Sequence, residues 1–240
     1  MRRLFATIAD RYDFITRFLS FGQDLRWKRR LIRLAGLRPS DRALDLACGT
    51  GDLLLEAAPR VRSAVGLDVT FRMAQLARQR TFASDRPAAV SDPPSPRSRV
   101  LVVTADMLAL PFGSAGFDVV TTGYGLRNVP DLDQALREIH RVLAPGGRLL
   151  SLDFNRPRNV VVRALYLTYL TIVGSALGLA LHRDADTYRY IPESIRSYPG
   201  AQGVSQLMAC LGFVEVQVIP VLGGLMAIHV ARKSVAAGAA

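Results

Sequence analysis

The chain has only two cysteines among its 240 residues, Cys48 and Cys210. Two cysteines cannot build the disulfide framework of a small secreted domain. There is no Cys-x-x-Cys pair, and the three histidines (His140, His182 and His229) lack metal-ligand spacing, so we expect no metal site. The first residues lack the apolar core of a signal peptide, which favours a cytoplasmic location.

Negative charge is also scarce, because 31 basic residues face 20 acidic ones, for a formal charge of +11. Residues 1–42 hold 11 basic and 4 acidic residues, a net charge of 11 − 4 = +7. Basic helices over residues 1–40 would suit an anionic membrane surface or a nucleic acid. An arginine-rich composition without a specific partner would give the same excess.

Half of the residues are apolar, enough for a large core, and we expect a single domain over 1–240. Short apolar runs that alternate with helical patterns predict an α/β fold with a parallel sheet. The predicted strands are 43–48, 64–68, 100–104, 117–122 and 148–154, and a helix is expected over 131–143. Two further strands, 213–219 and 225–230, are spaced as a hairpin. The fold class is therefore a Rossmann-like doubly wound sheet, mostly parallel, with one antiparallel strand near the C-terminus.

Two segments interrupt this alternation. Residues 83–99 are rich in proline and serine and predict a flexible surface loop. Residues 156–200 are too many for a simple connection and predict a helical insertion. Within it, 165–181 carry no charge but contain two glycines, and a membrane span needs about 20 apolar residues. We interpret this stretch as a helical lid over an apolar pocket that contacts lipid, with a membrane span as the alternative.

A ligand site is expected where the first strands end. Gly49 and Gly51 follow a strand and open a helix, where glycine permits a tight turn and a close approach to a ligand. Asp68 ends the second strand and can accept from ribose hydroxyls. Asp106 follows the third strand and can accept from an adenine amino group. Helix capping is the alternative role of both aspartates.

Together these elements resemble the class I S-adenosylmethionine-dependent methyltransferases. More specific motifs lie at 11–13 (Arg-Tyr-Asp), 20–22, 27–29, 125–129 (Gly-Leu-Arg-Asn-Val) and 186–190 with 193–195. These resemble the signatures of the UbiE-type quinone C-methyltransferases of ubiquinone and menaquinone biosynthesis. Thr16, Thr187 and Gly123 depart from that family's usual residues. Because the first two bear on substrate contacts, the identity of the quinol stays open, whereas Gly123 is a departure at the cofactor.

The resemblance implies methyl transfer from S-adenosylmethionine to a ring carbon of a polyprenylated demethylquinol. It implies a cofactor site made of Asp45, Gly49, Thr50, Gly51, Asp68, Val69, Asp106, Met107 and Gly123. It places Arg127 and Asn128 at the transferring methyl group, and we expect Tyr12, Tyr188 and Arg189 at the substrate. Tyr190 is a further aromatic candidate, and plain core packing is the alternative for these tyrosines. A naphthoquinol or a benzoquinol acceptor, and a homodimer, both remain open.

A ring carbon becomes nucleophilic when the neighbouring phenol loses its proton, and a free phenol has a pKa near ~10. A fixed guanidinium favours the phenolate, so Arg127 is predicted to assist electrostatically while Asn128 orients the hydroxyl. The alternative role of Arg127 is a structural ion pair. We expect no nucleic-acid substrate, because the turn over 122–125 lacks the Asn/Asp-Pro-Pro-aromatic motif and no cysteine follows proline. Two alternatives remain: a methyltransferase that acts on another small lipophilic molecule, and a catalytically silent scaffold.

Overall fold

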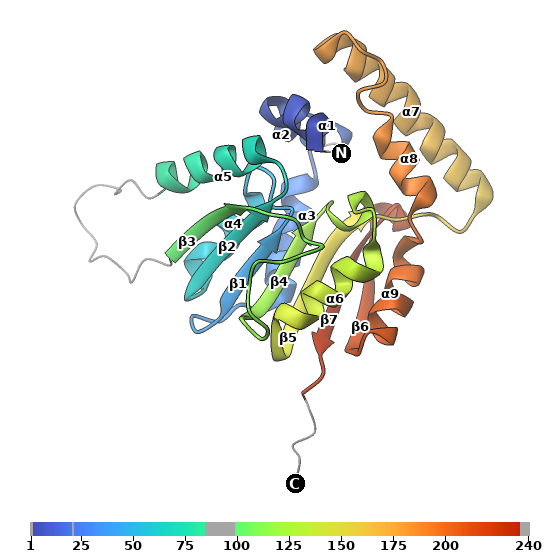
Figure 1. Cartoon of the computed structure of the whole chain (residues 1–240). Coiled ribbons are helices and arrows are strands. Elements are labelled where there is room, and N and C mark those ends of the chain that lie inside the picture. The colour runs from blue at the N-terminus through green and yellow to red at the C-terminus, as the bar shows by residue number, and fades with distance from the viewer. Residues whose placement is uncertain (1, 21, 85–98, 236–240) are drawn as a thin grey trace.

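A seven-stranded sheet forms the centre of the protein (Figure 1). The structure is a computed structural model that describes residues 2–20, 22–84 and 99–235. Along the sheet the strands follow the order β3-β2-β1-β4-β5-β7-β6. Their bounds are β1 (Arg42–Leu46), β2 (Ser63–Asp68), β3 (Arg99–Thr104), β4 (Phe117–Gly123), β5 (Leu143–Phe154), β6 (Phe213–Val221) and β7 (Met226–Lys233).

The first five strands are parallel, and β7 runs antiparallel to both of its neighbours. This confirms the predicted fold class. Several boundaries differ from the prediction, and those of β1 and β5 bear on the site. β1 ends at Leu46 because Ala47 adopts a positive φ of 49°, which turns the chain out of the strand. β5 already begins at Leu143, which pairs with Phe117, and the register of this pair then shifts before Val119.

Helices cover both faces of the sheet because neighbouring strand residues point to opposite sides. Val119 packs with helices α3 (Asp24–Ala35) and α4 (Asp52–Ala57), whereas Val120 packs with α6 (Leu132–Val142) and α9 (Gly200–Cys210). Helix α5 (Phe71–Ser84) packs on β2 and β3. A fully buried aliphatic side chain stabilises the fold by roughly 1.5–3 kcal/mol, so these two layers hold the strands' carboxyl ends in place.

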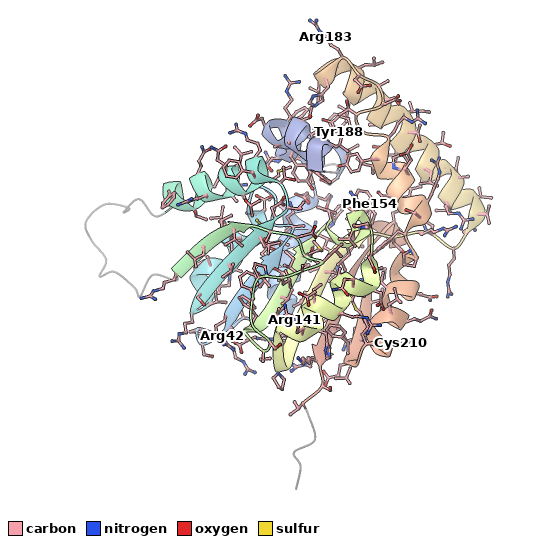
Figure 2. The ribbon with its side chains drawn as sticks, in the orientation of Figure 1. Arg42, Arg141, Phe154, Arg183, Tyr188 and Cys210 are labelled. Atoms are coloured by element: carbon pink, nitrogen blue, oxygen red, sulfur yellow. The ribbon has the colours of Figure 1, made fainter. Side chains whose placement is uncertain are left out.

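Two helical segments lie beyond the carboxyl ends of the parallel strands (Figure 1). One comprises α1 (Arg2–Ile8) and α2 (Tyr12–Leu19), and the other is the predicted insertion, formed by α7 (Val160–His182) and α8 (Tyr190–Ser197). Figure 2 shows Tyr188 between the N-terminal helices and α7, while Arg42 and Arg141 mark the opposite end of the sheet. The two segments therefore border the same edge of the sheet.

Two glycines explain how α7 is attached. A Cβ at Gly178 would lie 2.3 Å from the carbonyl oxygen of Asp184, and one at Gly174 would lie 3.3 Å from the Cβ of Tyr188. Glycine at both positions lets the chain fold back against the helix. The face of α7 that carries these glycines is thus packed, while other positions of the helix expose apolar side chains such as Val161 (67%) and Leu179 (58%).

Among the described residues, α7 is the one helix long and apolar enough to cross a membrane by length and composition. Only 22% of its most apolar stretch is buried within the protein. The Pro/Ser-rich segment predicted over 83–99 falls on residues 85–98, which lie outside the described residues.

Candidate active site

The glycine turn after β1 lies next to the point where the strand order reverses, between β1 and β4. Open α/β sheets bind ligands at this position. Gly49 adopts a positive φ of 55°, and its N–H donates to Asp68 Oδ2 at 2.9 Å. Asp68 Oδ1 accepts from the N–H of Thr70 at 2.8 Å. Burial raises the pKa of Asp68, although both backbone bonds favour its ionised form. A carboxylate is therefore fixed at the end of β2.

A cavity of about 620 Å³ opens along these strand ends, and we call it the crevice. It brings together eight of the residues predicted at the cofactor or the methyl group: Gly49, Asp68, Val69, Asp106, Met107, Gly123, Arg127 and Asn128. The volume suits a small-molecule site. Helix α8 closes one side with Glu193, Ser194 and Ser197. The first two belong to the motif over 193–195, but none of the three was predicted as a site residue.

The crevice fits an adenosyl group by its donor and acceptor groups. Each oxygen of Asp68 keeps a lone pair beyond its backbone bond and can accept from a ribose hydroxyl. Asp106 accepts from the N–H of Leu108 at 3.1 Å, which fixes its carboxylate on the crevice wall. Asn128 Oδ1 is buried and has no hydrogen-bond partner among the described residues. A buried polar atom of this kind favours a ligand that completes it.

Three residues predicted at the cofactor lie outside the crevice. Asp45 and Thr50 border a cavity of only about 20 Å³ behind the glycine turn. Asp45 accepts from Thr121 at 2.8 Å, and burial raises its pKa to about 7. Thr50 donates to Asp13 at 2.5 Å, and Gly51 precedes α4 with a φ of 93°. In this structure these residues shape and anchor the turn, and their contact with a cofactor stays a prediction.

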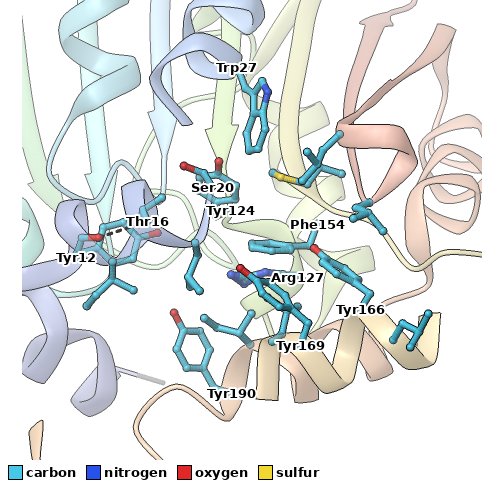
Figure 3. Close-up of a pocket in the computed structure, with 18 of the residues that line it drawn as sticks. Tyr12, Thr16, Ser20, Trp27, Tyr124, Arg127, Phe154, Tyr166, Tyr169 and Tyr190 are labelled. Carbon is cyan, nitrogen blue, oxygen red and sulfur yellow. Dashed lines mark hydrogen bonds between the residues drawn. The ribbon is translucent and has the colours of Figure 1, made fainter. Parts of the chain in front are cut away.

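A second cavity of about 380 Å³ lies beneath α7, and we call it the apolar cavity (Figure 3). Its walls are almost entirely aliphatic and aromatic, including Trp27, Phe154, Tyr166, Tyr169 and Leu170. The apolar cavity and the crevice share four lining residues: Tyr12, Tyr124, Arg127 and Tyr190. These four residues, which we call the boundary residues, are where a polar ligand and an apolar ligand would meet.

Arg127 carries the positive charge at this boundary. Its guanidinium stacks over the ring of Phe154 at 4.6 Å, and its Nε lies 3.3 Å from Asp153 Oδ1. Both side chains are only 3% exposed. Burial raises the pKa of Asp153 while Arg127 opposes that rise, and the net direction is upward. The structural ion pair that was the alternative role of Arg127 is thus present. Arg127 also lines both cavities. Its Nη1 has no hydrogen-bond partner among the described residues.

Asn128 holds the turn that presents Arg127. Its Nδ2 donates to the carbonyl oxygen of Tyr124 at 2.8 Å. Tyr124 itself has a positive φ of 61°, which is uncommon for a residue with a Cβ and marks a constrained backbone. The amide of Asn128 therefore stabilises the conformation between β4 and α6.

Two residues predicted at the substrate lie away from both cavities. Tyr188 is fully buried against α7, and its hydroxyl is 2.8 Å from His182 Nε2. Arg189 is exposed and pairs with Asp186 at 3.0 Å. Neither residue lines the crevice or the apolar cavity as far as the structure describes them, because α8 begins at Tyr190 and turns that ring inward instead. Tyr12, by contrast, lines both cavities, and its contact with the substrate stays a prediction.

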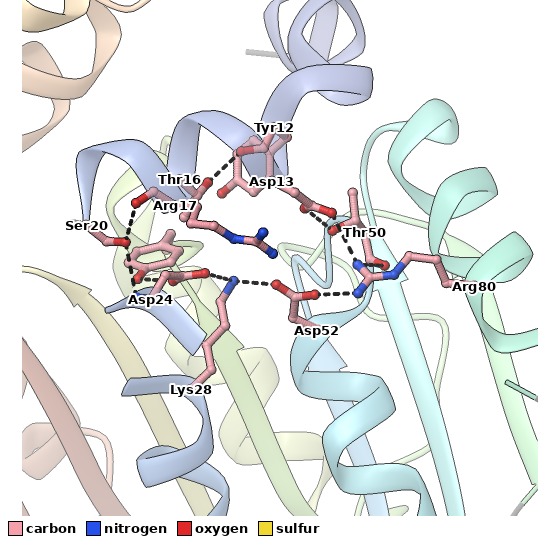
Figure 4. A network of polar contacts seen from close by, with 11 residues as sticks. Tyr12, Asp13, Thr16, Arg17, Ser20, Asp24, Lys28, Thr50, Asp52 and Arg80 are labelled. Carbon is pink, nitrogen blue, oxygen red and sulfur yellow. Dashed lines mark hydrogen bonds and ion pairs between the residues drawn. The ribbon is translucent and has the colours of Figure 1, made fainter. Parts of the chain in front are cut away.

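Tyr124 was not predicted at the site. Nor was the polar network next to it, which Figure 4 shows around Asp24, Lys28 and Asp52. The Tyr124 hydroxyl donates to Asp24 at 2.6 Å, and burial, followed by the charge of Asp24, raises its pKa. Lys28 bridges Asp24 at 2.7 Å and Asp52 at 2.9 Å, and Arg80 contacts Asp52 at 2.8 Å. Only the four-residue spacing of Asp24 and Lys28 was readable as a helical pair. The network ties the N-terminal helices to α4 and α5 beside the boundary.

Comparison with known proteins gives the family. The model of the ubiE/COQ5 methyltransferase family matches residues 1–233. A demethylmenaquinone methyltransferase of Thermus thermophilus is 40% identical over 96% of this chain and 100% of its own length. A ubiquinone/menaquinone biosynthesis C-methyltransferase UbiE of Geotalea uraniireducens is 35% identical over 97% and 96%.

Solved structures agree on the fold. An S-adenosylmethionine-dependent methyltransferase of Aquifex aeolicus superposes with a TM-score of 0.64 at 15% identity, covering 95% of this chain and 97% of that one. The strand order, the glycine turn beside Asp68 and a matching family model across residues 1–233 agree with one another. The chain therefore belongs to the ubiE/COQ5 methyltransferase family.

Proposed function

We propose that the chain methylates a ring carbon of a polyprenylated demethylquinol at the boundary between the crevice and the apolar cavity. Membership of the family makes it an S-adenosylmethionine-dependent C-methyltransferase of menaquinone or ubiquinone biosynthesis. The observation that carries the finer assignment is the set of four boundary residues that line both cavities. A polar site and an apolar site adjoin there, with these four side chains bordering both.

The crevice residues supply the donor side. Asp68 and Asp106 would hold the adenosine, and the glycine turn would accommodate the amino-acid portion. S-adenosylmethionine supplies an electrophilic methyl group when bound. Holding two reactants in the correct geometry can lower a barrier by roughly 7–11 kcal/mol. The packed layers around the strand ends give this chain the rigidity that such positioning needs.

Arg127 acts on the acceptor side. Its buried guanidinium favours the ionised form of a phenol placed beside it, which makes the neighbouring ring carbon nucleophilic. Arginine stays protonated in proteins, so we assign it electrostatic assistance rather than proton abstraction. Tyr12 and Tyr190 would contact the ring, and Asn128 would hold the turn that orients the guanidinium.

The substrate assignment is tested with purified protein and S-adenosylmethionine. Three acceptors are compared: a prenylated demethylnaphthoquinol, a prenylated demethylbenzoquinol, and phosphatidylethanolamine as a lipid without a quinol ring. The proposal expects methylation of at least one quinol and none of the phospholipid. Methylation of the phospholipid alone would favour the alternative of another lipophilic acceptor, and donor binding without any turnover would favour a silent scaffold.

We further propose that the protein binds the membrane surface peripherally through α2 and α7. The rings of Phe14 and Phe18 on α2 are about half exposed, at 56% and 51%, and Ile172 and Leu179 are exposed on α7. Exposed apolar side chains in such number indicate an interaction site. A peripheral position is favoured over a span because the inner face of α7 lines the apolar cavity and both its ends return to the sheet domain.

Liposome flotation tests this association. The protein is expected to float with vesicles that contain anionic lipid, and about 1 kcal/mol per nearby arginine should make the binding sensitive to salt. Ile172→Glu should weaken flotation strongly. Leu101→Glu is the matched control, because Leu101 is 62% exposed on β3, outside both α2 and α7. Equal flotation of the two variants would contradict the assignment of this surface.

A further inference from the structure

A groove of about 730 Å³ runs along the outside of the protein between α2 and α7. Apolar side chains form nearly all of its walls, and Arg17 is the one charged residue among the lining residues that the structure describes. Its lining residues are Arg17, Phe18, Gly22, Tyr169, Ile172, Val173, Ala176, Leu177 and Ala180. The groove is open to solvent and lies outside the boundary residues.

The groove continues the apolar cavity. Tyr169 lines both, and both lie between the same two helices. On α7 the lining passes from Leu165 through Tyr169 and Val173 to Ala176 and Ala180, a spacing of three or four residues that keeps one face of the helix. With a rise of 1.5 Å per residue, this face extends about 22 Å from Leu165 to Ala180.

We propose that the groove binds the isoprenoid tail of the acceptor, which leaves the apolar cavity past Tyr169. This inference rests on the proposed function, because it names where one substrate's tail lies. An occupant that continues from the boundary must carry a ring with polar oxygens at one end and a long hydrocarbon chain at the other. The walls of the groove on α2 and α7 match a hydrocarbon tail, since they offer aromatic and aliphatic contacts and almost no hydrogen-bonding groups.

Arg17 supports the same assignment of the groove. It is the charged member of the groove and lies next to Phe18, which is 51% exposed. An arginine that borders an apolar groove suits a position near the phosphates of an anionic bilayer, while the hydrocarbon tail continues into the lipid. The groove thereby connects the reacting ring with the membrane in which a polyprenylated quinol resides.

The proposal is tested by filling the groove with a bulky side chain and comparing the methylation of two acceptors that have the same ring but different tails. One acceptor carries a single prenyl unit, which the apolar cavity can hold, and the other carries a tail of several units. Ala176→Trp should lower kcat/KM at least about tenfold for the long-tailed acceptor and leave the short-tailed one within about twofold. Ala180→Trp, one turn farther out, should show the same selectivity to a smaller degree.

Ala164→Trp is the matched control, because Ala164 is an exposed alanine of α7 that lines neither cavity nor groove among the described residues. It should methylate both acceptors like the parent protein. Equal losses with both acceptors, or no loss with either, would overturn the groove assignment. If the groove instead joins two copies of the protein, the groove variants should change the oligomeric state without any dependence on tail length. That result would also overturn the groove assignment. Failure of the parent protein to methylate either quinol would contradict the proposed function itself.

Discussion

The ion pair between Arg127 and Asp153 gives a prediction in which the two partners have opposite effects on the reaction. Arg127 faces both cavities, and Asp153 lies on its other side, with Nε and Oδ1 3.3 Å apart. A phenolate beside the guanidinium is attracted by Arg127 and repelled by Asp153. A neutral residue at either position should therefore shift the ionisation of the acceptor, in opposite directions.

The distances give the magnitude. A phenolate about 4 Å from the guanidinium gains about 4 kcal/mol at an effective dielectric constant of about 20. The carboxylate, about 7 Å from that oxygen, costs about 2 kcal/mol. The net stabilisation of about 2 kcal/mol corresponds to about 30-fold in rate, or about 1.5 pH units. Arg127→Met removes the attraction and leaves the repulsion, so it should raise the barrier by about 4 kcal/mol and lower kcat roughly 1,000-fold. Asp153→Asn removes the repulsion alone and should move the acidic limb of the kcat profile toward lower pH.

The assay measures kcat against pH for both variants, together with the free energy of unfolding. Each single substitution leaves one buried charge without its partner and should cost roughly 3–5 kcal/mol of stability. The double variant Arg127→Met with Asp153→Asn should recover that stability but only part of the rate, and stay about 30-fold below the parent protein. Arg127→Lys should also recover part of the rate. If both single variants lower kcat alike with an unmoved pH profile, the pair is only structural and the electrostatic role of Arg127 is refuted.

Three further predictions concern the crevice and its support. Asp68→Asn should weaken S-adenosylmethionine binding by about 10- to 100-fold in calorimetry, because hydrogen bonds to a charged group contribute about 1.5–3 kcal/mol, while the KM of the quinol stays unchanged. Burial raises the pKa of Asp45 to about 7, so ionisation of this carboxyl should reduce stability as pH rises from about 4 through 7. Asp45→Asn, which can still accept from Thr121, should remove that loss in urea unfolding curves, and identical pH dependences would contradict it. Lys28→Met should lower the free energy of unfolding by about 3–5 kcal/mol, because two buried carboxylates lose their shared cation, and a loss below about 1 kcal/mol would contradict the bridging role.

The core of the fold was predictable because its signals are local. Buried parallel strands appear as short apolar runs, and their alternation with helical patterns leaves few topologies. Glycines and carboxylates that follow successive strands meet at one edge of a parallel sheet, which is why Gly49, Asp68 and Asp106 were found together. The start of β5 was misplaced because Leu143 pairs with β4 before the Pro-Gly-Gly turn, and a turn motif predicts an end to regular structure.

The rest of the site depends on contacts between distant segments. Whether Tyr188 or Tyr190 faces the substrate is decided by where α8 begins and by the glycines of α7, and neither is visible in the motif itself. The hydrogen bond from Tyr124 to Asp24 joins residues a hundred positions apart, so no spacing rule indicates it. Asp153 was read only as a strand residue, although it is the partner of Arg127.

The most direct test of the account is a crystal structure of the protein with S-adenosylhomocysteine and a prenylated demethylquinol. The account predicts the ribose against Asp68, the sulfur directed toward Tyr12 and Arg127, and the acceptor ring in the apolar cavity. When a methyl group is placed on the sulfur, its carbon should lie within about 3–3.5 Å of the acceptor ring carbon. A nucleoside bound away from the β2 edge, or a quinol separated from the sulfur by a wall of side chains, would contradict it.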